Sequence, residues 1–497
     1  NPSDEDEKDF SLLGMPSHSD WVFHAPYNFD RSLLHNPLMY ALSNSVGRYA
    51  VRNRMAEVFV DVNSAGLSFA GNASGDYFGV YNVMEKIRRG NDRVDITRLD
   101  TYDNDAVRNS GGYIFKIDRL DSGDSGFSAG GQAFVYYYPK ERDLKSPQRD
   151  PQEKALTAYL NDLNTRLQST TNWKDPVLGY APKLDVPAAV DHHLLNVWSF
   201  NVDALRLSGY WTKDRSGKVF PGPIWDFDRT LSSTDGRDAN PLTWRSTVPD
   251  LGTDFFNYPW WNRLFLDPDF YQKYIDRWQE LRAGPLGRTS LEALIDSLNA
   301  QITAEAITRD LAKWAQSKRA WTRPFAAPEN NTIAASQAAE VQRLKDYMRQ
   351  RAGFMDGQWV GPVTVSVPSG FLAAGSTVAL TGPAGVPIYY TLDGSDPRPS
   401  GGAAPGVGPT LYAGPVTIST NTRLRARAYK STHTAFTGAN NPALVSKWGG
   451  PVDVAYTTES PAAPGDLILS EINYHPVNPT VAELAINPAW TDEDFEF

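Results

Sequence analysis

Two acidic side chains, Asp226 and Asp228, lie close together in the run Trp225-Asp-Phe-Asp-Arg-Thr-Leu231, next to a short apolar segment. A third acid, Asp203, precedes Asp226 by 23 residues. Magnesium-dependent phosphoryl transfer uses carboxylates of this kind, because one takes a proton from the attacking group while another holds the metal on the nucleotide phosphates. These acids therefore suggest a phosphoryl-transfer site.

The acids sit in one continuous stretch whose elements can be read in order. A helix with an apolar face ends at Phe200, and the polar loop after it carries Asp203. An aromatic strand follows over Tyr210–Thr212, a hairpin turn over Arg215–Lys218, and the returning strand delivers Asp226. A loop acid, a ligand position five residues later, a hairpin and a second acid are typical of a kinase catalytic segment.

Two other interpretations fit the same residues. The run matches the Asp-x-Asp-x-Thr-Leu signature of haloacid-dehalogenase phosphatases, in which a nucleophile and an acid lie two residues apart. That motif needs a buried parallel strand before Asp226, but Pro221 and Pro223 interrupt this approach, and a central strand tolerates proline poorly. In the third interpretation the acids are surface groups paired with nearby cations: Arg215, Lys218 or Arg229.

Length and composition restrict the classes of protein. The chain has 497 residues, which predicts roughly three domains. Its net charge of −10 argues against nucleic acid as the main partner, because phosphate backbones are bound by clustered Lys and Arg. The absence of cysteine excludes disulfides and thiolate metal sites and leaves the compartment open. No apolar run is long enough for a membrane span, and no signal peptide begins the chain, which we interpret as a fragment or a processed form.

The periodicity predicts strands first and helices second, which favours a two-lobed α+β domain with a cleft between the lobes. Strands are expected at Glu57–Val62, Tyr77–Val83 and Gly112–Ile117. Long amphipathic helices are expected at Gln152–Leu167, Pro187–Phe200, Pro268–Leu281, Leu291–Arg309 and Ala334–Arg351.

From Val363 onward charged residues become about half as frequent, which marks a domain boundary. Short runs rich in Val, Thr, Tyr and Ile, separated by Gly and Pro, predict an all-β immunoglobulin-like sandwich. Its strands are expected at Val363–Val367, Ser376–Leu380, Ile388–Leu392, Val416–Ile418, Arg423–Tyr429 and Val452–Tyr456.

Six ordered segments carry a resemblance to a known family: Asp20-Trp-Val-Phe-His-Ala-Pro-Tyr, Asp30-Arg-Ser-Leu-Leu-His-Asn-Pro, Gly79-Val-Tyr-Asn-Val-Met-Glu-Lys-Ile, Gly111-Gly-Tyr-Ile-Phe-Lys-Ile-Asp, Asn201-Val-Asp and Trp225-Asp-Phe-Asp. With these segments the sequence resembles the spore-coat protein H (CotH) kinase family, whose members share an atypical protein-kinase fold. The resemblance covers about residues 20–235 directly. Several motifs in the family's order are far more specific than any single one.

The resemblance implies roles for individual residues. Asp203 would be the catalytic base or would orient the acceptor hydroxyl, and Asp226 would be the main magnesium ligand. Lys116 would contact the phosphates of ATP, with Glu85 as the partner that fixes it. A competing interpretation makes Glu85 a solvated helix acid paired with one of two nearby cations: Arg88 or Arg89.

One position departs from the pattern of related kinases. Those enzymes generally have Asn five residues after the catalytic acid, whereas this chain has Ser208. A serine hydroxyl ligates magnesium but reaches less far than an amide oxygen, so the expected outcomes are weaker metal binding, substitution by Asn201, or altered or lost activity. Asp228 is either a second metal ligand or pairs with Arg229 or Arg206.

Other residues that attract attention are expected to be structural. Adjacent histidines cannot share a helix face as metal ligands, so His192 and His193 are assigned to packing. The tryptophans at 244, 260 and 261 are assigned to the core rather than to a sugar or peptide groove. A glycine-rich loop matches no phosphate-binding pattern and is interpreted as a flexible turn: Gly66, Gly71, Gly75 and Gly79.

The downstream segments resemble accessory domains. Ile388-Tyr-Tyr-Thr-Leu-Asp-Gly-Ser-Asp-Pro397 is similar to the C-terminal β-sandwich of chitobiases and β-hexosaminidases, and Asp393-Gly394 suits a tight hairpin turn. Leu467–Pro476 resembles the beginning of a lamin-tail domain. Both types are common in large bacterial secreted or surface proteins, which predicts an exported location and contacts with the cell surface or polysaccharide through the sandwich.

The predicted layout is an acidic extension at 1–19, a CotH kinase-like domain at 20–358, a sandwich at 359–458 and an incomplete lamin-tail-like segment at 464–497. The leading hypothesis is an ATP- and magnesium-dependent kinase that phosphorylates Ser or Thr of an exported or surface protein. Adenylylation or glutamylation on the same scaffold is a second hypothesis. The third is a non-catalytic surface or matrix protein with a degenerate kinase domain.

Overall fold

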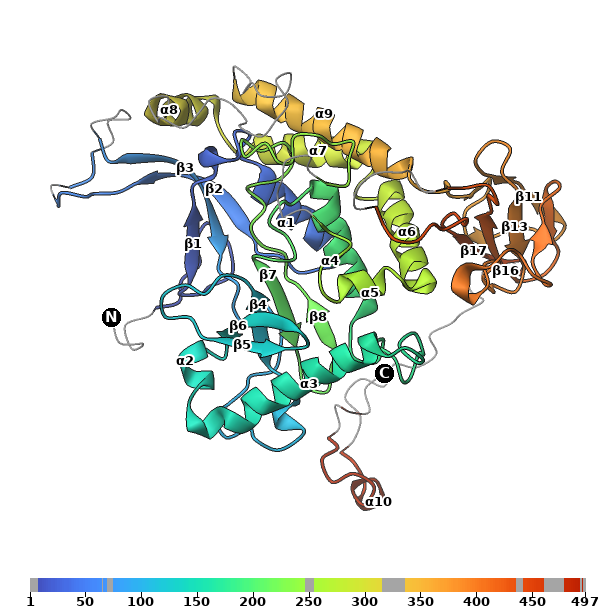
Figure 1. Ribbon diagram of the computed structural model, residues 1–497, viewed down its shortest axis with the longest axis horizontal. Coiled ribbons are helices and arrows are strands. Elements are labelled where there is room, and N and C mark those ends of the chain that lie inside the picture. Colours follow the sequence, from blue (N-terminus) through green and yellow to red (C-terminus); the bar gives the residue numbers. More distant parts are fainter. Residues whose placement is uncertain are drawn as a thin grey trace.

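The computed structural model describes residues 8–64, 66–68, 75–245, 254–314, 336–434, 441–459, 478–491 and 494. A mixed α/β region precedes a smaller β-rich domain, and the two lie toward opposite ends of the long axis (Figure 1). Their hydrophobic cores are separate, one within residues 34–359 and one within residues 360–456. This arrangement confirms the expected multidomain organisation. The predicted lamin-tail-like stretch at Leu467–Pro476 lies outside the described residues.

A three-stranded antiparallel sheet forms one part of the α/β region. Its strand order is β1-β3-β2, with β1 at Trp21–His24, β2 at Asn53–Phe59 and β3 at Tyr77–Glu85. Helix α1 (His35–Ser45) follows β1 and is buried for most of its length. Alternation along the strands directs Val22, Met55 and Met84 to the face that packs on the main core.

A five-stranded sheet, ordered β5-β6-β4-β7-β8, forms the second part. Its strands are β4 (Tyr113–Ile117), β5 (Gly126–Ala129), β6 (Gln132–Tyr138), β7 (Gly209–Lys213) and β8 (Val219–Pro221). The β7–β8 hairpin confirms the turn predicted at Arg215–Lys218. However, β7 pairs with β4 across about a hundred residues, so the expected separation of early strands from later helices is incomplete.

The helices match the predicted periodicity closely. They are α2 (Glu141–Leu144), α3 (Asp150–Gln168), α4 (Val186–Ser199), α5 (Trp261–Leu264), α6 (Pro268–Ala283), α7 (Arg288–Asn299), α8 (Ala304–Trp314), α9 (Gln337–Asp356) and the outlying α10 (Val481–Leu484). The single helix expected at Leu291–Arg309 is wrong, because the helix is interrupted between the end of α7 and the start of α8. The hydroxyl of Thr303 accepts the N–H of Ala306 there and begins the second helix.

Helix α4 is the element that leads into the predicted catalytic loop. Asp185 begins it by accepting the N–H of Ala188 (2.9 Å), and almost every residue of the helix is buried. Phe200 ends it with a φ of +56°, and the N–H of Asn201 then bonds the carbonyl of Asn196 (2.9 Å). The loop that carries Asp203 therefore starts from a fixed point in the core.

The C-terminal domain is β-rich, with strands at Thr364–Val365 (β9), Gly370–Phe371 (β10), Ser376–Val378 (β11), Leu380–Thr381 (β12), Ile388–Thr391 (β13), Thr410–Leu411 (β14), Val416–Ile418 (β15), Thr422–Ala428 (β16) and Val452–Thr457 (β17). A five-stranded sheet β10-β17-β16-β13-β14 accompanies the pairs β11-β15 and β12-β9. A strand lies within or overlaps every predicted run, although the first two runs are shorter or divided.

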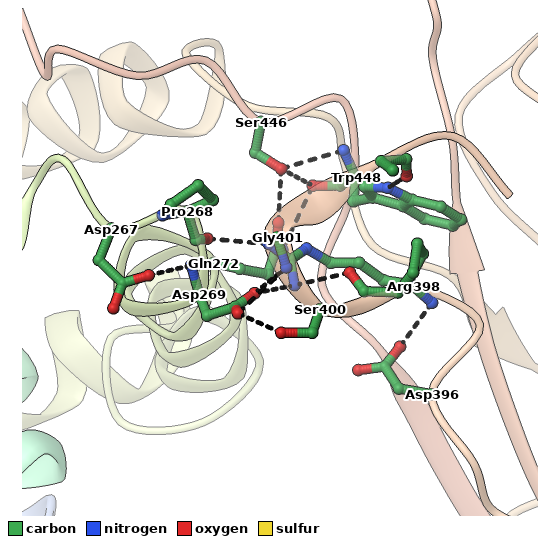
Figure 2. A network of polar contacts seen from close by, with 12 residues as sticks. Asp267, Pro268, Asp269, Gln272, Asp396, Arg398, Ser400, Gly401, Ser446 and Trp448 are labelled. Carbon is green, nitrogen blue, oxygen red and sulfur yellow. Dashed lines mark hydrogen bonds and ion pairs between the residues drawn. The ribbon is translucent and has the colours of Figure 1, made fainter. Parts of the chain in front are cut away.

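Helix α6 anchors this domain through a polar network at its first turns (Figure 2). Asp269 accepts Arg398 Nη1 and Ser400 Oγ, each at 2.6 Å, and the N–H of Gly401 at 2.9 Å. Farther along the helix, the fully buried Arg427 bonds both carboxylate oxygens of Asp276 at 2.7 Å. Bidentate pairs of this kind fix orientation as well as proximity, so the domain is held in one pose.

Within the described ranges, no helix combines the length and the apolar character that crossing a lipid bilayer requires.

Candidate active site

Helix α1 positions the loop that carries Asp226 and Asp228. The hydroxyl of Tyr40 accepts the backbone N–H of Asp226 (3.2 Å), and the amide oxygen of Asn36 accepts the N–H of the next residue (2.7 Å). A ring nitrogen of His35 lies 3.3 Å from the carbonyl oxygen of Asp228. Three side chains of one buried helix therefore hold the backbone of the acidic loop.

The backbone of this region is strained at several non-glycine positions. Asp226 has a φ of +64° and Ser208 a φ of +51°, and Leu205, Leu231 and Ser232 are also left-handed. L-residues rarely adopt these angles, at a cost of about 1–3 kcal/mol each, and such residues cluster at functional sites. The surrounding packing must therefore impose this geometry on the loops around the acids.

Asp226 and Asp228 form a buried, interacting pair of carboxyl groups. Burial raises the pKa of Asp226 and is its largest influence. Burial, and then the charge of Asp226, raises the pKa of Asp228 to about 8. Ser208 Oγ donates to Asp226 Oδ2 at 3.3 Å, which favours the ionised carboxylate. Two acids that resist simultaneous ionisation form a site that a cation stabilises strongly.

Asp203 lies beside this pair and is surrounded by arginines. Its carboxylate is 2.7 Å from Arg206, 3.5 Å from Arg237 and 3.7 Å from Arg229, and its charge acts on Asp226. The structure thus brings Asp203, Ser208, Asp226 and Asp228 into one cluster. The arginines also place positive charge beside the acidic cluster, and guanidinium groups are suitable donors to phosphate oxygens.

Asn201 connects the two acidic loops. Its amide oxygen accepts the N–H of Asp203 (3.2 Å), while its amide nitrogen donates to the carbonyl of Asp226 (3.4 Å) and to Asn196 Oδ1 (3.2 Å). These bonds occupy the side chain that the sequence offered as a substitute metal ligand. In this structure Asn201 sets the relative position of Asp203 and Asp226.

Lys116 lies on β4 opposite Tyr210 of β7, and its ammonium is 3.0 Å from Asp118. The Tyr210 ring packs on Trp225 (centroids 6.3 Å apart), which stacks on Tyr40 (6.0 Å). An aromatic chain therefore connects the strand next to Lys116 with the acidic loop. No direct contact between Lys116 and the acids is seen among the described residues.

Glu85 is fully buried at the end of β3, so its interpretation as a solvated helix acid paired with Arg88 or Arg89 is wrong. Its carboxylate accepts Arg52 Nε (3.0 Å) and the hydroxyl of Tyr49 (3.2 Å). Lys116 pairs with Asp118, so this structure does not show the predicted pair between Lys116 and Glu85. Glu85 has these partners because it lies on a strand in the core and not on a solvated helix.

A cavity of about 340 Å³ adjoins the face of the sheet that carries Lys116. Thr212 on β7 lies on the same face as Tyr210 and Lys116, because residues two apart on a strand share a face. Apolar side chains line much of the cavity: Tyr49, Val94, Ile96, Phe220 and Pro223. Pro223 is three residues before Asp226, a distance of at most about 10 Å along the chain. A larger cavity of about 720 Å³ lies elsewhere, between α3 and the β7–β8 turn.

The donor set suits magnesium. Asp226, Asp228 and Ser208 offer only oxygen atoms, and Mg²⁺ prefers one or two carboxylates together with substrate phosphates. No group of three or more His, Asp or Glu side chains arranged to hold a metal occurs in the described part of the chain. The residues therefore fit a metal shared with a nucleotide better than a metal held by protein alone.

The remaining expectations concern packing. Both His192 and His193 are buried, which lowers their pKa values to about 4 and about 3. The tryptophans at 244, 260 and 261 are also in the core. Of the glycine loop, Gly71 lies outside the described residues.

The segment that leads to Asp226 begins at β8, which is antiparallel to β7. It therefore does not match the parallel strand that the phosphatase motif requires.

Sequence reasoning assigned no role to four groups that organise this site: Tyr40, Asn36, His35 and Arg237. The segment Asp30-Arg-Ser-Leu-Leu-His-Asn-Pro contains two of them, and its polar residues within an apolar helix were the available signal. Arg237 stands in a loop without a pattern. Only the folded chain brings it to Asp203.

Comparison with known protein families gives two matches. The family described as CotH kinase protein matches residues 1–355, which is most of the chain. The family described as Chitobiase/beta-hexosaminidase C-terminal domain matches residues 367–437. No curated protein matches the chain significantly.

Proposed function

The chain belongs to the CotH kinase family, and on this premise we propose that it transfers the γ-phosphoryl group of ATP to a Ser or Thr hydroxyl of a protein. Family membership implies nucleotide use. The observation that carries the proposal is the buried pair Asp226–Asp228 beside Asp203. Mutually destabilised carboxylates next to an acid in a strained loop suit a metal–nucleotide site.

Each residue of the cluster has a proposed role. Asp203 accepts the proton of the acceptor hydroxyl, or orients that hydroxyl. The hydroxyl oxygen forms a bond to the γ-phosphorus while the bond from that phosphorus to the leaving ADP breaks. Asp226 and Asp228 hold magnesium, with Ser208 as a third oxygen donor. When bound, magnesium neutralises charge on the phosphate oxygens.

We assign the base of the nucleotide to the smaller cavity beside the β7–β8 hairpin. This cavity of about 340 Å³ accepts the base, because apolar side chains line much of it and Pro223, three residues before Asp226, is part of its wall. Lys116 contacts the phosphates from the same face of the sheet. Glu85 contributes indirectly by holding Tyr49, whose ring lines the cavity.

The location and the partners are also proposals. A kinase region joined to a domain of the chitobiase C-terminal type suits a protein that works at a cell surface or outside the cell. The acceptor would then be an exported protein, and the sandwich would contact the surface or its polysaccharide. The buried anchor on α6 supports joint action, because it keeps both domains in one orientation.

Transfer of labelled phosphate to a protein acceptor tests the proposal. Asp226→Asn should abolish transfer, and Asp203→Asn should lower it by roughly 10²–10⁴-fold if Asp203 is a general base. Glu292→Gln, at a half-buried position of α7 where the acid pairs with Arg288 and Arg349, is a control that should leave transfer unchanged. Equal transfer by all four proteins would refute the assignment.

Two alternatives stay open: adenylylation or glutamylation on the same scaffold, and a non-catalytic surface or matrix protein, for which Ser208 is the supporting feature. Intact mass spectrometry of the acceptor distinguishes a phosphoryl adduct from an AMP or a glutamate adduct. A protein that binds neither ATP nor magnesium in calorimetry would instead be a non-catalytic surface protein.

A further inference from the structure

Three buried side-chain atoms of two neighbouring residues on the β1–β3 sheet have no hydrogen-bond partner among the residues that the structure describes. The amide of Asn82 is fully buried, and neither its nitrogen nor its oxygen has a hydrogen-bond partner among the described residues. The Nε2 atom of His24 is also buried and unpartnered within the same described ranges. Buried polar groups are nearly always paired, so three unpaired atoms on adjacent strands need an explanation.

His24 and Asn82 lie opposite each other. They are partners in the antiparallel register of β1 and β3, so their side chains emerge on the same face, a few ångströms apart. Their row continues into Met55 of β2, and the next row contains Val22 and Met84. Those three apolar residues pack on the core, so the unpaired polar pair lies beside apolar neighbours.

This surface faces the acidic loop. The charges of Asp226 and Asp30 both act on His24, and His24 in turn acts on Asp226. The loop after Asp226 is fastened to the segment after β1, because Thr234 donates its N–H to the carbonyl of Phe29 at 2.8 Å. The His24–Asn82 pair and the Asp226–Asp228 pair thus approach one another from different elements.

We propose that His24 and Asn82 are the phosphoryl-binding side chains of the β1–β3 sheet and donate hydrogen bonds to the phosphate oxygens of a nucleotide whose magnesium Asp226 and Asp228 would hold. This inference rests on the proposed function and names the groups that recognise the phosphates from the second side. Phosphate oxygens are strong acceptors, and an imidazole N–H and an amide N–H are suitable donors.

The geometry also requires a movement. All three atoms are covered, so a phosphate reaches them only when neighbouring side chains shift or the sheet separates from the Asp226 loop. Closure of a cleft around the substrate is common in phosphoryl transfer, because it excludes water. In the arrangement seen here, the unpaired polar atoms lower the stability of the protein. After the movement, the ligand supplies the missing hydrogen bonds and removes that cost.

The test uses the loss of stability that the unpaired amide of Asn82 causes. Asn82→Leu removes the unpaired amide with little change of volume, so the thermal midpoint without ligand should stay the same or rise. Phosphate transfer and the stabilisation by Mg–ATP should fall at least tenfold. His24→Leu should lose activity to a similar extent, and His24→Gln, which retains an N–H donor, should recover part of it.

A buried amide that does have partners provides the control. Gln152 on α3 donates to the carbonyl of Asp100 (2.7 Å) and accepts Arg149 Nη1 (2.8 Å). Gln152→Met should therefore lower the thermal midpoint and leave transfer per folded molecule unchanged. If Asn82→Leu behaves like Gln152→Met, the amide is structural and the inference is overturned.

A second ligand separates this inference from the kinase proposal. Magnesium tripolyphosphate carries the phosphates without the base. If it stabilises the wild type but not Asn82→Leu, while no transfer from ATP occurs, phosphate recognition stands and the kinase proposal fails. If the wild type transfers phosphate and the His24 and Asn82 variants do so equally well, only this inference fails. If neither ligand stabilises the wild type, both are overturned.

Discussion

The hydroxyl of Tyr40 accepts the backbone N–H of Asp226 at 3.2 Å, joining residues 186 positions apart in the chain. Tyr40 is fully buried, and its ring stacks on Trp225. Asp226 needs this support, because its left-handed backbone (φ +64°) is costly for a residue with a side chain. A tyrosine on α1 therefore helps to set the direction of the carboxylate proposed to hold magnesium.

Tyr40→Phe tests this relationship. It leaves the N–H of Asp226 without its acceptor in a buried setting, which should cost about 1–3 kcal/mol of stability and lower transfer by roughly tenfold. The matched control is Tyr347→Phe, since the Tyr347 hydroxyl is buried without a partner among the described residues. Steady-state kinetics and thermal unfolding of both variants would check the expectation, and equal activities would show that Tyr40 only packs.

Asp228→Asn should stabilise the protein while abolishing transfer. The pKa of Asp228 rises from 3.8 to about 8 on folding, so the native state binds more protons than the unfolded chain between these values. Stability from this group consequently falls as pH rises from about 4 to about 8. The gain from Asn should be negligible below pH 4 and reach at most about 6 kcal/mol above pH 8, because each pKa unit corresponds to about 1.4 kcal/mol.

The same linkage predicts how magnesium acts on the wild type. Metal binding must displace a proton from the acid pair, so magnesium should stabilise the protein more at pH 8 than at pH 6. Denaturant titrations at several pH values, with and without magnesium, measure both effects. A stability difference between wild type and Asp228→Asn that does not vary with pH would contradict the proposed pairing of the acids.

Filling the smaller cavity should weaken nucleotide binding selectively. Ile96→Phe adds volume to the proposed base site and should raise the Kd for Mg–ATP by about tenfold, about 1.4 kcal/mol, with little effect on magnesium tripolyphosphate. Ala158→Phe, directed at the larger cavity beside α3, is the control and should leave ATP affinity unchanged. Calorimetry with both ligands distinguishes a base site from general destabilisation.

Arg427→Ala should release the sandwich from α6. The guanidinium is buried between Asp276 and Asp396, and its removal takes the cation from Asp276 and leaves Asp396 paired with Arg425, at a cost of about 3–5 kcal/mol. We expect thermal unfolding of the variant to split into two transitions or to broaden relative to the wild type, because the two cores are separate. Arg423→Ala, which removes an exposed pair with Asp453, should change stability by less than about 1 kcal/mol. Equal effects of the two substitutions would argue against the anchor.

Local patterns alone determined much of this protein. The spacing of apolar residues predicted α3, α4, α6 and α9 within a few residues, and turn chemistry predicted the β7–β8 hairpin, because these elements depend on neighbours close in the chain. The same logic marked Asp203 and Asp226 as acids on two loops joined by that hairpin. A capping threonine that divides α7 from α8 was a local signal that the periodicity obscured.

Tertiary structure alone decided which groups meet. Tyr40 contacts Asp226, Arg237 contacts Asp203, and Glu85 bonds Arg52, since strand register and helix packing set these distances. His24 and Asn82 likewise become neighbours only through the pairing of β1 with β3. Sequence determines what a residue can do, whereas contacts between distant segments depend on the whole packing arrangement, which no local pattern encodes.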